Sequence, residues 1–277
     1  MRRHGRLLVT ATCYAVAEHL RNRFAMVLVA GFIPTWTALA YLAVPNAPAE
    51  LRLRATGQLL RPAGNQLSEI TGALNAVSLI VGFMMFAAAF SGGHFDRRLV
   101  MAGYPRIHLV VAKMSALVLA SGAVAVYAVA VTHFLWTPWQ PVLLAAALFC
   151  AALTYGAIGV ALGSLLRREV EGMFAIVMIS VIDVYLQNPI ASSGSDSPIV
   201  RLLPSYGAVQ ASTAAGFSDT ALPGYLAVQL LWFTGAALIG LLAFQRRTRN
   251  TLSLSPRHPR RRLPEQTVRS CVEETEV

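Results

Sequence analysis

The chain has 277 residues, of which 56% are hydrophobic and 13% are charged, and its formal net charge is +10. Six long apolar stretches take up most of that length, so the composition excludes a sizeable soluble domain. A basic excess can indicate a nucleic-acid partner, but here the Lys and Arg residues flank the apolar stretches. That placement indicates membrane topology and contact with the headgroups of a lipid bilayer, and no nucleic-acid partner.

Residues 1–23 precede the first apolar stretch and carry a narrow apolar stripe. Val9, Cys13, Val16 and Leu20 recur at helical spacing, which is typical of an amphipathic helix. The pattern predicts a helix that lies at the cytoplasmic membrane interface before the chain enters the membrane. The alternative is a frayed start that is simply basic.

The six apolar stretches predict transmembrane helices, because about 18 or more residues without charge can span the hydrocarbon core. The third stretch carries Lys113 near one end, and the fifth is shorter and contains Asp183. We expect one all-α, six-span membrane domain over residues 1–245 and a disordered, basic cytoplasmic tail over 246–277. The predicted spans are about 24–44, 70–92, 108–136, 142–166, 173–187 and 224–244.

Basic residues are distributed unequally between the two sides of these spans. Nineteen of the 23 Lys and Arg residues fall on the side that holds both chain ends. The other side holds only Arg52, Arg54, Arg61 and Arg201. Cytoplasmic loops carry an excess of Lys and Arg, so this asymmetry predicts that both termini are cytoplasmic.

Two connections are more than simple turns. After the second span, Ser91-Gly92-Gly93 and the charged residues that follow predict a turn, then a short helix over 99–103 that ends before Pro105. Between the fifth and sixth spans, the segments 199–203 and 206–215 are apolar enough to predict short re-entrant helices in the outer leaflet.

Some residues within the spans are candidates for function. Asp183 lies ~15 Å into its span, near the bilayer middle, where an ionisable group often marks a substrate path. The alternative is a span that ends early at Asn188-Pro189, with Asp183 in the outer interface as a hydrogen-bonding group. An aromatic and methionine cluster offers a soft apolar surface to a lipophilic substrate, although ordinary packing explains it equally well; it comprises Phe83, Met84 and Phe86.

Other motifs concern packing and chemistry. Gly159 and Gly163 form a small-xxx-small pair that permits close helix contact. The sequence has no GxxxxGK[ST], GxSxG or HExxH motif, so we expect a non-catalytic chain that does not bind a nucleotide by itself. Its three cysteines show no metal-binding spacing, and we expect no metal site.

In its architecture the chain resembles the permease subunit of a type 2 ABC exporter, a family that includes bacterial drug and antibiotic exporters. The resemblance rests on the amphipathic entry helix, six spans with both ends inside, the 94–113 loop and the long outer segment before the last span. The runs Leu162-Gly163-Ser164-Leu165-Leu166-Arg167-Arg168 and Leu202-Leu203-Pro204-Ser205-Tyr206-Gly207 are also similar to the family.

The resemblance implies partners and a coupling site. In this family the first cytoplasmic loop rests on a separate ATPase subunit, which binds ATP and Mg. A second permease subunit, identical or paralogous, completes the pathway. The corresponding coupling residues here are Asp96, Arg97, Arg98, Tyr104, Pro105 and Arg106.

These expectations combine into one functional hypothesis. The chain is expected to form half of an ATP-driven export pathway in the bacterial cytoplasmic membrane, for a hydrophobic or amphipathic substrate such as a drug, an antibiotic or a lipid-like molecule. The alternative is a membrane-integral accessory or regulatory protein without a translocation path.

Overall fold

The structure is a computed structural model that describes residues 2–249, apart from 55, 193–194 and 196. Side chains at 2–8, 24, 94, 95, 97, 106, 244 and 247–249 also lie outside the description. The helices are α1 (Arg2–Arg21), α2 (Arg23–Ala43), α3 (Gly64–Met101), α4 (Arg106–Leu135), α5 (Pro141–Leu165), α6 (Glu169–Gln187), α7 (Tyr206–Phe217) and α8 (Pro223–Arg249). A 3-10 helix, η1 (Pro198–Leu202), and a small hairpin of β1 (Leu51–Arg52) and β2 (Leu59–Leu60) complete the fold.

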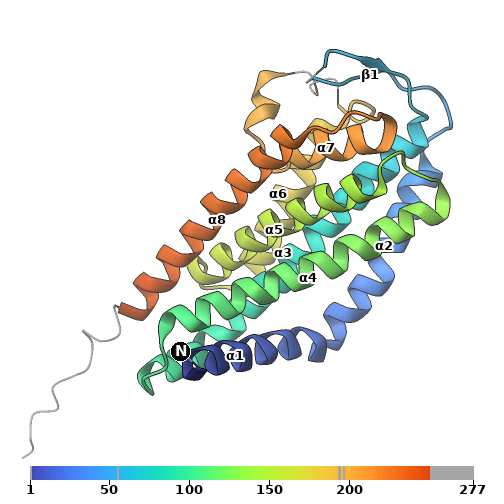
Figure 1. The fold of residues 1–277 in the computed structure, drawn as a ribbon. Helices are drawn as coiled ribbons and strands as arrows, with labels where there is room; N and C mark the ends of the chain where they lie inside the picture. The colour runs from blue at the N-terminus through green and yellow to red at the C-terminus, as the bar shows by residue number, and fades with distance from the viewer. Residues whose placement is uncertain (1, 55, 193–194, 196, 250–277) are drawn as a thin grey trace, which may run out of the picture.

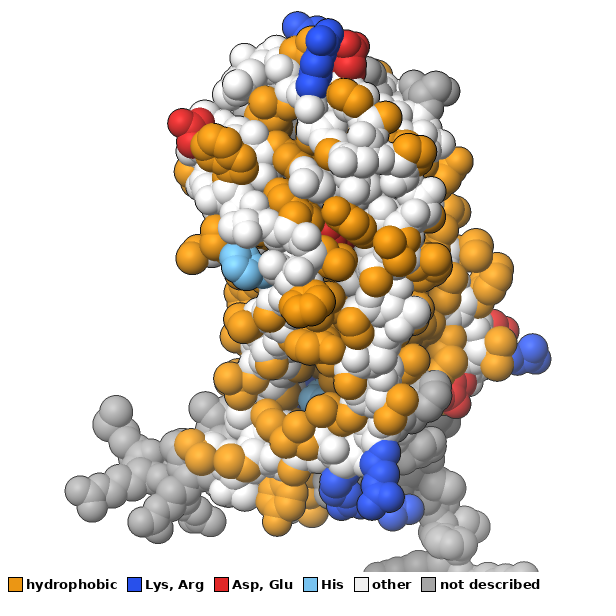
Figure 2. Space-filling view, turned by 90° about the vertical axis from the view of Figure 1, so that its right-hand side faces the viewer, with side chains coloured by type: hydrophobic (Ala, Val, Ile, Leu, Met, Phe, Trp, Pro, Cys, Tyr) orange, Lys and Arg blue, Asp and Glu red, His pale blue; other side chains and the backbone are white. Residues whose placement is uncertain are grey.

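The protein is an all-α, multi-pass membrane protein. Among the described residues, five helices are long and apolar enough to cross a membrane. Hydrophobic side chains cover the middle of the face in Figure 2, with Lys and Arg side chains at the top, at the bottom and at the right edge of the view. The five candidate spans are Ala25–Ala43, Gly64–Gly93, Ile107–Leu135, Pro141–Leu165 and Pro223–Ala243. The fifth predicted span corresponds to α6, which is not one of these five and carries Glu169, Glu171 and Asp183.

The helix expected over the first residues is present as α1, which runs across one end of the bundle (Figure 1). The chain turns at Asn22, whose side-chain oxygen accepts a hydrogen bond from the Ala25 amide at 3.1 Å and so caps α2. The end of α8 lies at the same end of the bundle as α1 (Figure 1). Both ends of the described chain are therefore on one side.

Pro34 sits inside α2, where it cannot donate a hydrogen bond to the Ala30 carbonyl one turn earlier. Tyr127 of α4 supplies a replacement, because its hydroxyl donates to that carbonyl at 3.0 Å. The Thr37 hydroxyl donates to the Ile33 carbonyl at 2.7 Å in the same turn. A neighbouring helix thus satisfies the backbone group that Pro34 leaves open, as membrane helices require.

The core of the bundle is the contact between α3 and α5. A Cβ atom added at Gly159 would lie 2.3 Å from the Gly82 carbonyl oxygen, and one at Gly163 would lie 2.8 Å from the Phe86 carbonyl oxygen. The two helix backbones therefore approach more closely than any larger residue allows. α5 packs on its other sides against α4, α7 and α8.

The segment after the second span differs from the expectation. The predicted turn at 91–93 and the separate helix over 99–103 are wrong, because α3 continues through Gly92 and Gly93 to Met101. An ion pair between Asp96 of α3 and Lys113 of α4 fixes this extension. The first turn of the predicted tail is also helical, since α8 extends to Arg249, and residues 250–277 lie outside the described part of the chain.

The opposite end of the bundle is covered by the hairpin, η1 and α7 (Figure 1). Short helices occur where the segments 199–203 and 206–215 predicted them, and nearly all of α7 is buried. Arg54 of the hairpin donates to the Ser195 carbonyl and lies 5.9 Å from the centre of the Tyr206 ring. Side-chain contacts therefore hold the hairpin on the loop before α7.

Candidate functional site

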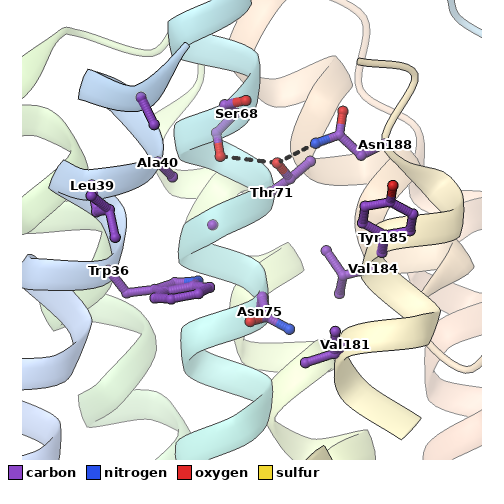
Figure 3. A pocket seen from close by; sticks show the side chains of 12 residues that line it. Trp36, Leu39, Ala40, Ser68, Thr71, Asn75, Val181, Val184, Tyr185 and Asn188 are labelled. Atoms are coloured by element: carbon purple, nitrogen blue, oxygen red, sulfur yellow. Dashed lines mark hydrogen bonds between the residues drawn. The ribbon is translucent and has the colours of Figure 1, made fainter. Parts of the chain in front are cut away.

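A cavity of about 360 Å³ opens between α2, α3 and α6, toward the hairpin end of the bundle (Figure 3). Its walls are mostly apolar, and the Trp36 ring lies across its α2 side. No charged residue lines the cavity among the residues that the structure describes. The lining residues are Trp36, Leu39, Ala40, Ala43, Ser68, Thr71, Gly72, Asn75, Val181, Val184, Tyr185 and Asn188.

The polar groups of the cavity lie along one face of α3. Ser68, Thr71 and Asn75 follow the i, i+3, i+7 spacing of a helix face. Asn188 donates to the Thr71 hydroxyl at 3.3 Å, and Asn75 donates to the Ser180 hydroxyl at 3.1 Å. These bonds join α3 to α6 behind the cavity and leave uncharged amide and hydroxyl groups in its wall.

The shape of the cavity depends on a close contact at Gly72. A Cβ atom there would lie 2.7 Å from the Ala40 side chain. The two helices, α2 and α3, are therefore too close at this point to accommodate any residue larger than glycine. Trp36 of α2 and Ser68 of α3 line the cavity near this contact (Figure 3). A partly open site of this kind suits an uncharged or amphipathic molecule that enters from the bilayer, because its apolar part gains contact and its polar part finds neutral partners.

Asp183 does not line this cavity. It is 2% exposed, and its carboxylate is held by donors from three other residues. The Tyr155 hydroxyl and the Ser205 amide donate to Oδ2, the latter at 2.9 Å, and Gln187 donates to Oδ1 at 2.7 Å. The residue joins α5, α6 and the turn before α7, and its predicted place on a substrate path stays a prediction.

The predicted aromatic and methionine cluster is also away from the cavity. Phe86 is fully buried, and its ring packs against Gly172 at the start of α6, where an added Cβ would lie 2.1 Å from it. Phe86 also stacks on Phe90, with ring centres 5.6 Å apart. Met84 is 8% exposed, and Phe83 is half-buried. The role of these residues in substrate passage likewise stays a prediction.

The predicted coupling residues gather at the other end of the bundle, near α1. Arg98 and Pro105 are exposed, whereas Asp96 is buried in its ion pair with Lys113. Tyr104 is half-buried and packs edge-on against His108, with ring centres 6.4 Å apart. The side chains of Arg97 and Arg106 lie outside the described part of the structure.

Charged groups of α1 lie close to this ion pair. Burial raises the pKa of Glu18; Lys113 opposes that shift and Asp96 adds to it. Burial also lowers the pKa of His19, and the positive charge of Lys113 lowers it further. The three helices α1, α3 and α4 therefore share one electrostatic cluster at this end.

Sequence reasoning did not identify the cavity or the partners of Asp183. The helical spacing of Ser68, Thr71 and Asn75 was a usable signal for a polar face on α3. Tyr155 and Ser205 gave no local signal, because they come from distant parts of the chain. No model of a protein family matches the chain, and no curated protein matches it.

Proposed function

We propose that this chain is the membrane-spanning subunit of an ATP-driven exporter of the type 2 ABC class. It forms half of a translocation pathway for a hydrophobic or amphipathic substrate and is driven by a separate ATPase subunit. The observation that carries the proposal is the partly open, uncharged cavity between α2, α3 and α6. A cavity with one open side supports a pathway that a second permease subunit completes.

The exposed faces beside the cavity support this assignment. Val181 and Ile182 of α6 and Leu39 of α2 are large apolar residues between 42% and 54% exposed. Such faces suit either lipid or another copy of the same subunit. Counting α6, whose 19 residues correspond to ~28 Å of helix, the proposed subunit has six spans.

The opposite end supports contact with an ATPase. Arg98 and Pro105 project there beside the cluster of Glu18, Asp96 and Lys113. With both termini in the cytoplasm of a bacterial cell, this end faces the ATPase. A force applied near Arg98 reaches the cavity directly, because α3 is continuous from Gly64 to Met101 and also lines the cavity.

The test fills the cavity without disturbing the core. Val181→Trp places a large side chain in the cavity, and Ile182→Trp is the matched control on the next, similarly exposed position outside it. In inside-out vesicles that also contain the co-purifying ATPase, we expect ATP-dependent uptake of a lipophilic dye by the wild type and by Ile182→Trp. Val181→Trp should lose at least about 90% of this ATP-dependent uptake. A tenfold fall in uptake corresponds to a free-energy change of ~1.4 kcal/mol.

Two results would contradict the proposal. Wild-type vesicles without ATP-dependent uptake, although the chain is inserted and the ATPase is present, would favour an accessory protein. Equal uptake by Val181→Trp and Ile182→Trp would remove the cavity from the pathway.

A further inference from the structure

One buried acid in the bundle, Glu69, lacks a hydrogen bond of normal geometry among the described residues. Glu69 lies in the second turn of α3, inside the candidate span Gly64–Gly93, and its side chain is 0% exposed. Neither carboxyl oxygen has a hydrogen-bond partner among the described residues. Asp183 is equally buried but accepts hydrogen bonds from three residues. Within the described part of the chain, Glu69 is therefore a buried acid with neither an ion pair nor a hydrogen bond of normal geometry.

The indole of Trp136, at the end of α4, is a polar neighbour of Glu69. The indole interacts electrostatically with the carboxyl group, yet its Nε1 atom also has no hydrogen-bond partner in the structure. The Trp136 ring stacks on Phe217 at the end of α7, with ring centres 5.3 Å apart and planes within 4°. The neighbour of the carboxyl thus belongs to an aromatic pair that joins the end of α4 to the end of α7.

No described charge offsets an ionised Glu69. The helices packed against the outer half of α3 include α2, α4, α5, α6 and α7. In the outer halves of these helices the described Lys, Arg, Asp and Glu residues reduce to Asp183 of α6, whose carboxylate is held by Tyr155, Ser205 and Gln187. His133 of α4 is exposed, and none of the ion pairs in the described structure involves Glu69. The remaining titratable groups of these halves, none of which is hydrogen-bonded to Glu69 in the described structure, are Tyr41, Tyr127, Cys150, Tyr185 and Tyr206.

The physical consequence concerns the protonation of this side chain. A carboxylate without donors or a counter-ion is strongly disfavoured inside a bundle surrounded by hydrocarbon, whereas a neutral carboxylic acid is tolerated. The indole N–H of Trp136 is a donor to either form and does not select the neutral acid; the burial of Glu69 does. A metal cation does not suit the site, since the indole presents a donor and no further oxygen ligand.

We propose that Glu69 is a proton-binding site within the membrane, which holds its proton while this end of the bundle is closed. Release breaks the carboxyl O–H bond, passes the proton to water and leaves a carboxylate that must be hydrated. Hydration separates α3 from the Trp136–Phe217 pair and loosens this end of the bundle. The site does not depend on an ATPase or on the proposed transport function.

The first test is infrared spectroscopy of the full chain in lipid nanodiscs. At neutral pH we expect the carbonyl band of a protonated carboxyl group, which should disappear at alkaline pH. Glu69→Gln should lack the band, and Glu50→Gln should keep it, because Glu50 is exposed and paired with Arg61. Absence of the band from the wild type at neutral pH would overturn the proposal, as would a band lost in Asp183→Asn but kept in Glu69→Gln.

The second test measures the fluorescence emission of Trp136, one member of the aromatic pair. With Trp36, Trp139 and Trp232 replaced by Phe, Trp136 is the one remaining tryptophan. When the pH is raised across the range in which the infrared band disappears, the emission of Trp136 should shift to longer wavelength as water enters. Glu69→Leu should abolish that shift. An emission maximum that stays constant in the presence of Glu69, or the same shift in Glu69→Leu, would overturn the proposed opening. Both spectra are also recorded on protein that keeps Glu69. The proposal is therefore testable even if one Glu69 variant does not fold.

Discussion

At the residue scale, the bundle holds most of its buried polar groups in small networks that join helices. Gln229 of α8 donates to the Thr154 hydroxyl of α5 at 2.8 Å and accepts from the Ala208 amide of α7 at 2.9 Å. Asp183 acts in the same way for α5, α6 and the turn at Ser205. Each network satisfies groups that would otherwise be costly in a membrane domain. Several buried polar atoms lie outside these networks, among them the hydroxyls of Ser78 and Ser121, and Glu69 is the one carboxyl group in that set among the described residues.

Tyr155→Phe tests whether the Asp183 network stabilises the fold. The change removes the hydroxyl that donates to Asp183 and leaves a buried carboxylate oxygen with one donor fewer. Loss of a hydrogen bond to a charged group costs ~1.5–3 kcal/mol, so the midpoint of thermal unfolding in detergent should fall clearly. Tyr185→Phe is the control, because Tyr185 lies on α6 but is 55% exposed. Equal midpoints for the two variants would show that the hydrogen bond contributes little.

At the element scale, the apolar stretches and basic flanks were enough to place most helices. The bounds of α2, α4, α5 and α8 agree with the predicted spans to within a few residues at most ends. The continuation of α3 past Gly93 was not predictable, because glycines followed by charged residues locally favour a turn. The helix persists there because Asp96 pairs with Lys113, a contact between helices that no local pattern encodes.

The same limit applies to the cavity. Its walls come from α2, α3 and α6, so its existence depends on how three separate segments pack. The composition indicates an apolar substrate. The location of a site for that substrate depends on how the helices pack against one another. The predicted substrate surface of Phe83, Met84 and Phe86 rests on their residue types alone. In the bundle, the Phe86 ring fills the space at Gly172.

Gly159→Ala tests the contact between α3 and α5. An added Cβ would lie 2.3 Å from the Gly82 carbonyl oxygen, and backbone on both sides must move to relieve the clash. Overpacking of this kind costs ~1–3 kcal/mol, so the unfolding midpoint should fall. Gly235→Ala is the matched control within α8, because nothing lies within 4 Å of its added Cβ. A Gly159→Ala protein as stable as Gly235→Ala would mean that the two helices are less closely packed than in this structure.

At the scale of the whole molecule, the two ends of the bundle differ in construction. One end carries α1, the exposed Arg98 and both ends of the described chain, and the other carries the hairpin, η1 and α7 (Figure 1). The unequal distribution of Lys and Arg follows the same division, with 19 of 23 assigned to the side of the chain ends. The orientation of the bundle in the membrane therefore decides which end would meet the proposed ATPase and which would face outward.

Single-cysteine labelling in intact cells measures that orientation. On a background with Cys13, Cys150 and Cys271 replaced, Thr56→Cys in the hairpin should react with a membrane-impermeant maleimide. Met101→Cys, which is 63% exposed at the end of α3, should react only after the membrane is permeabilised. This outcome is expected because the basic side of a membrane protein stays in the cytoplasm. The opposite labelling pattern would place α1 and Arg98 outside the cell, where ATP-driven coupling is impossible, and would refute the proposed exporter while leaving the fold and the Glu69 site intact.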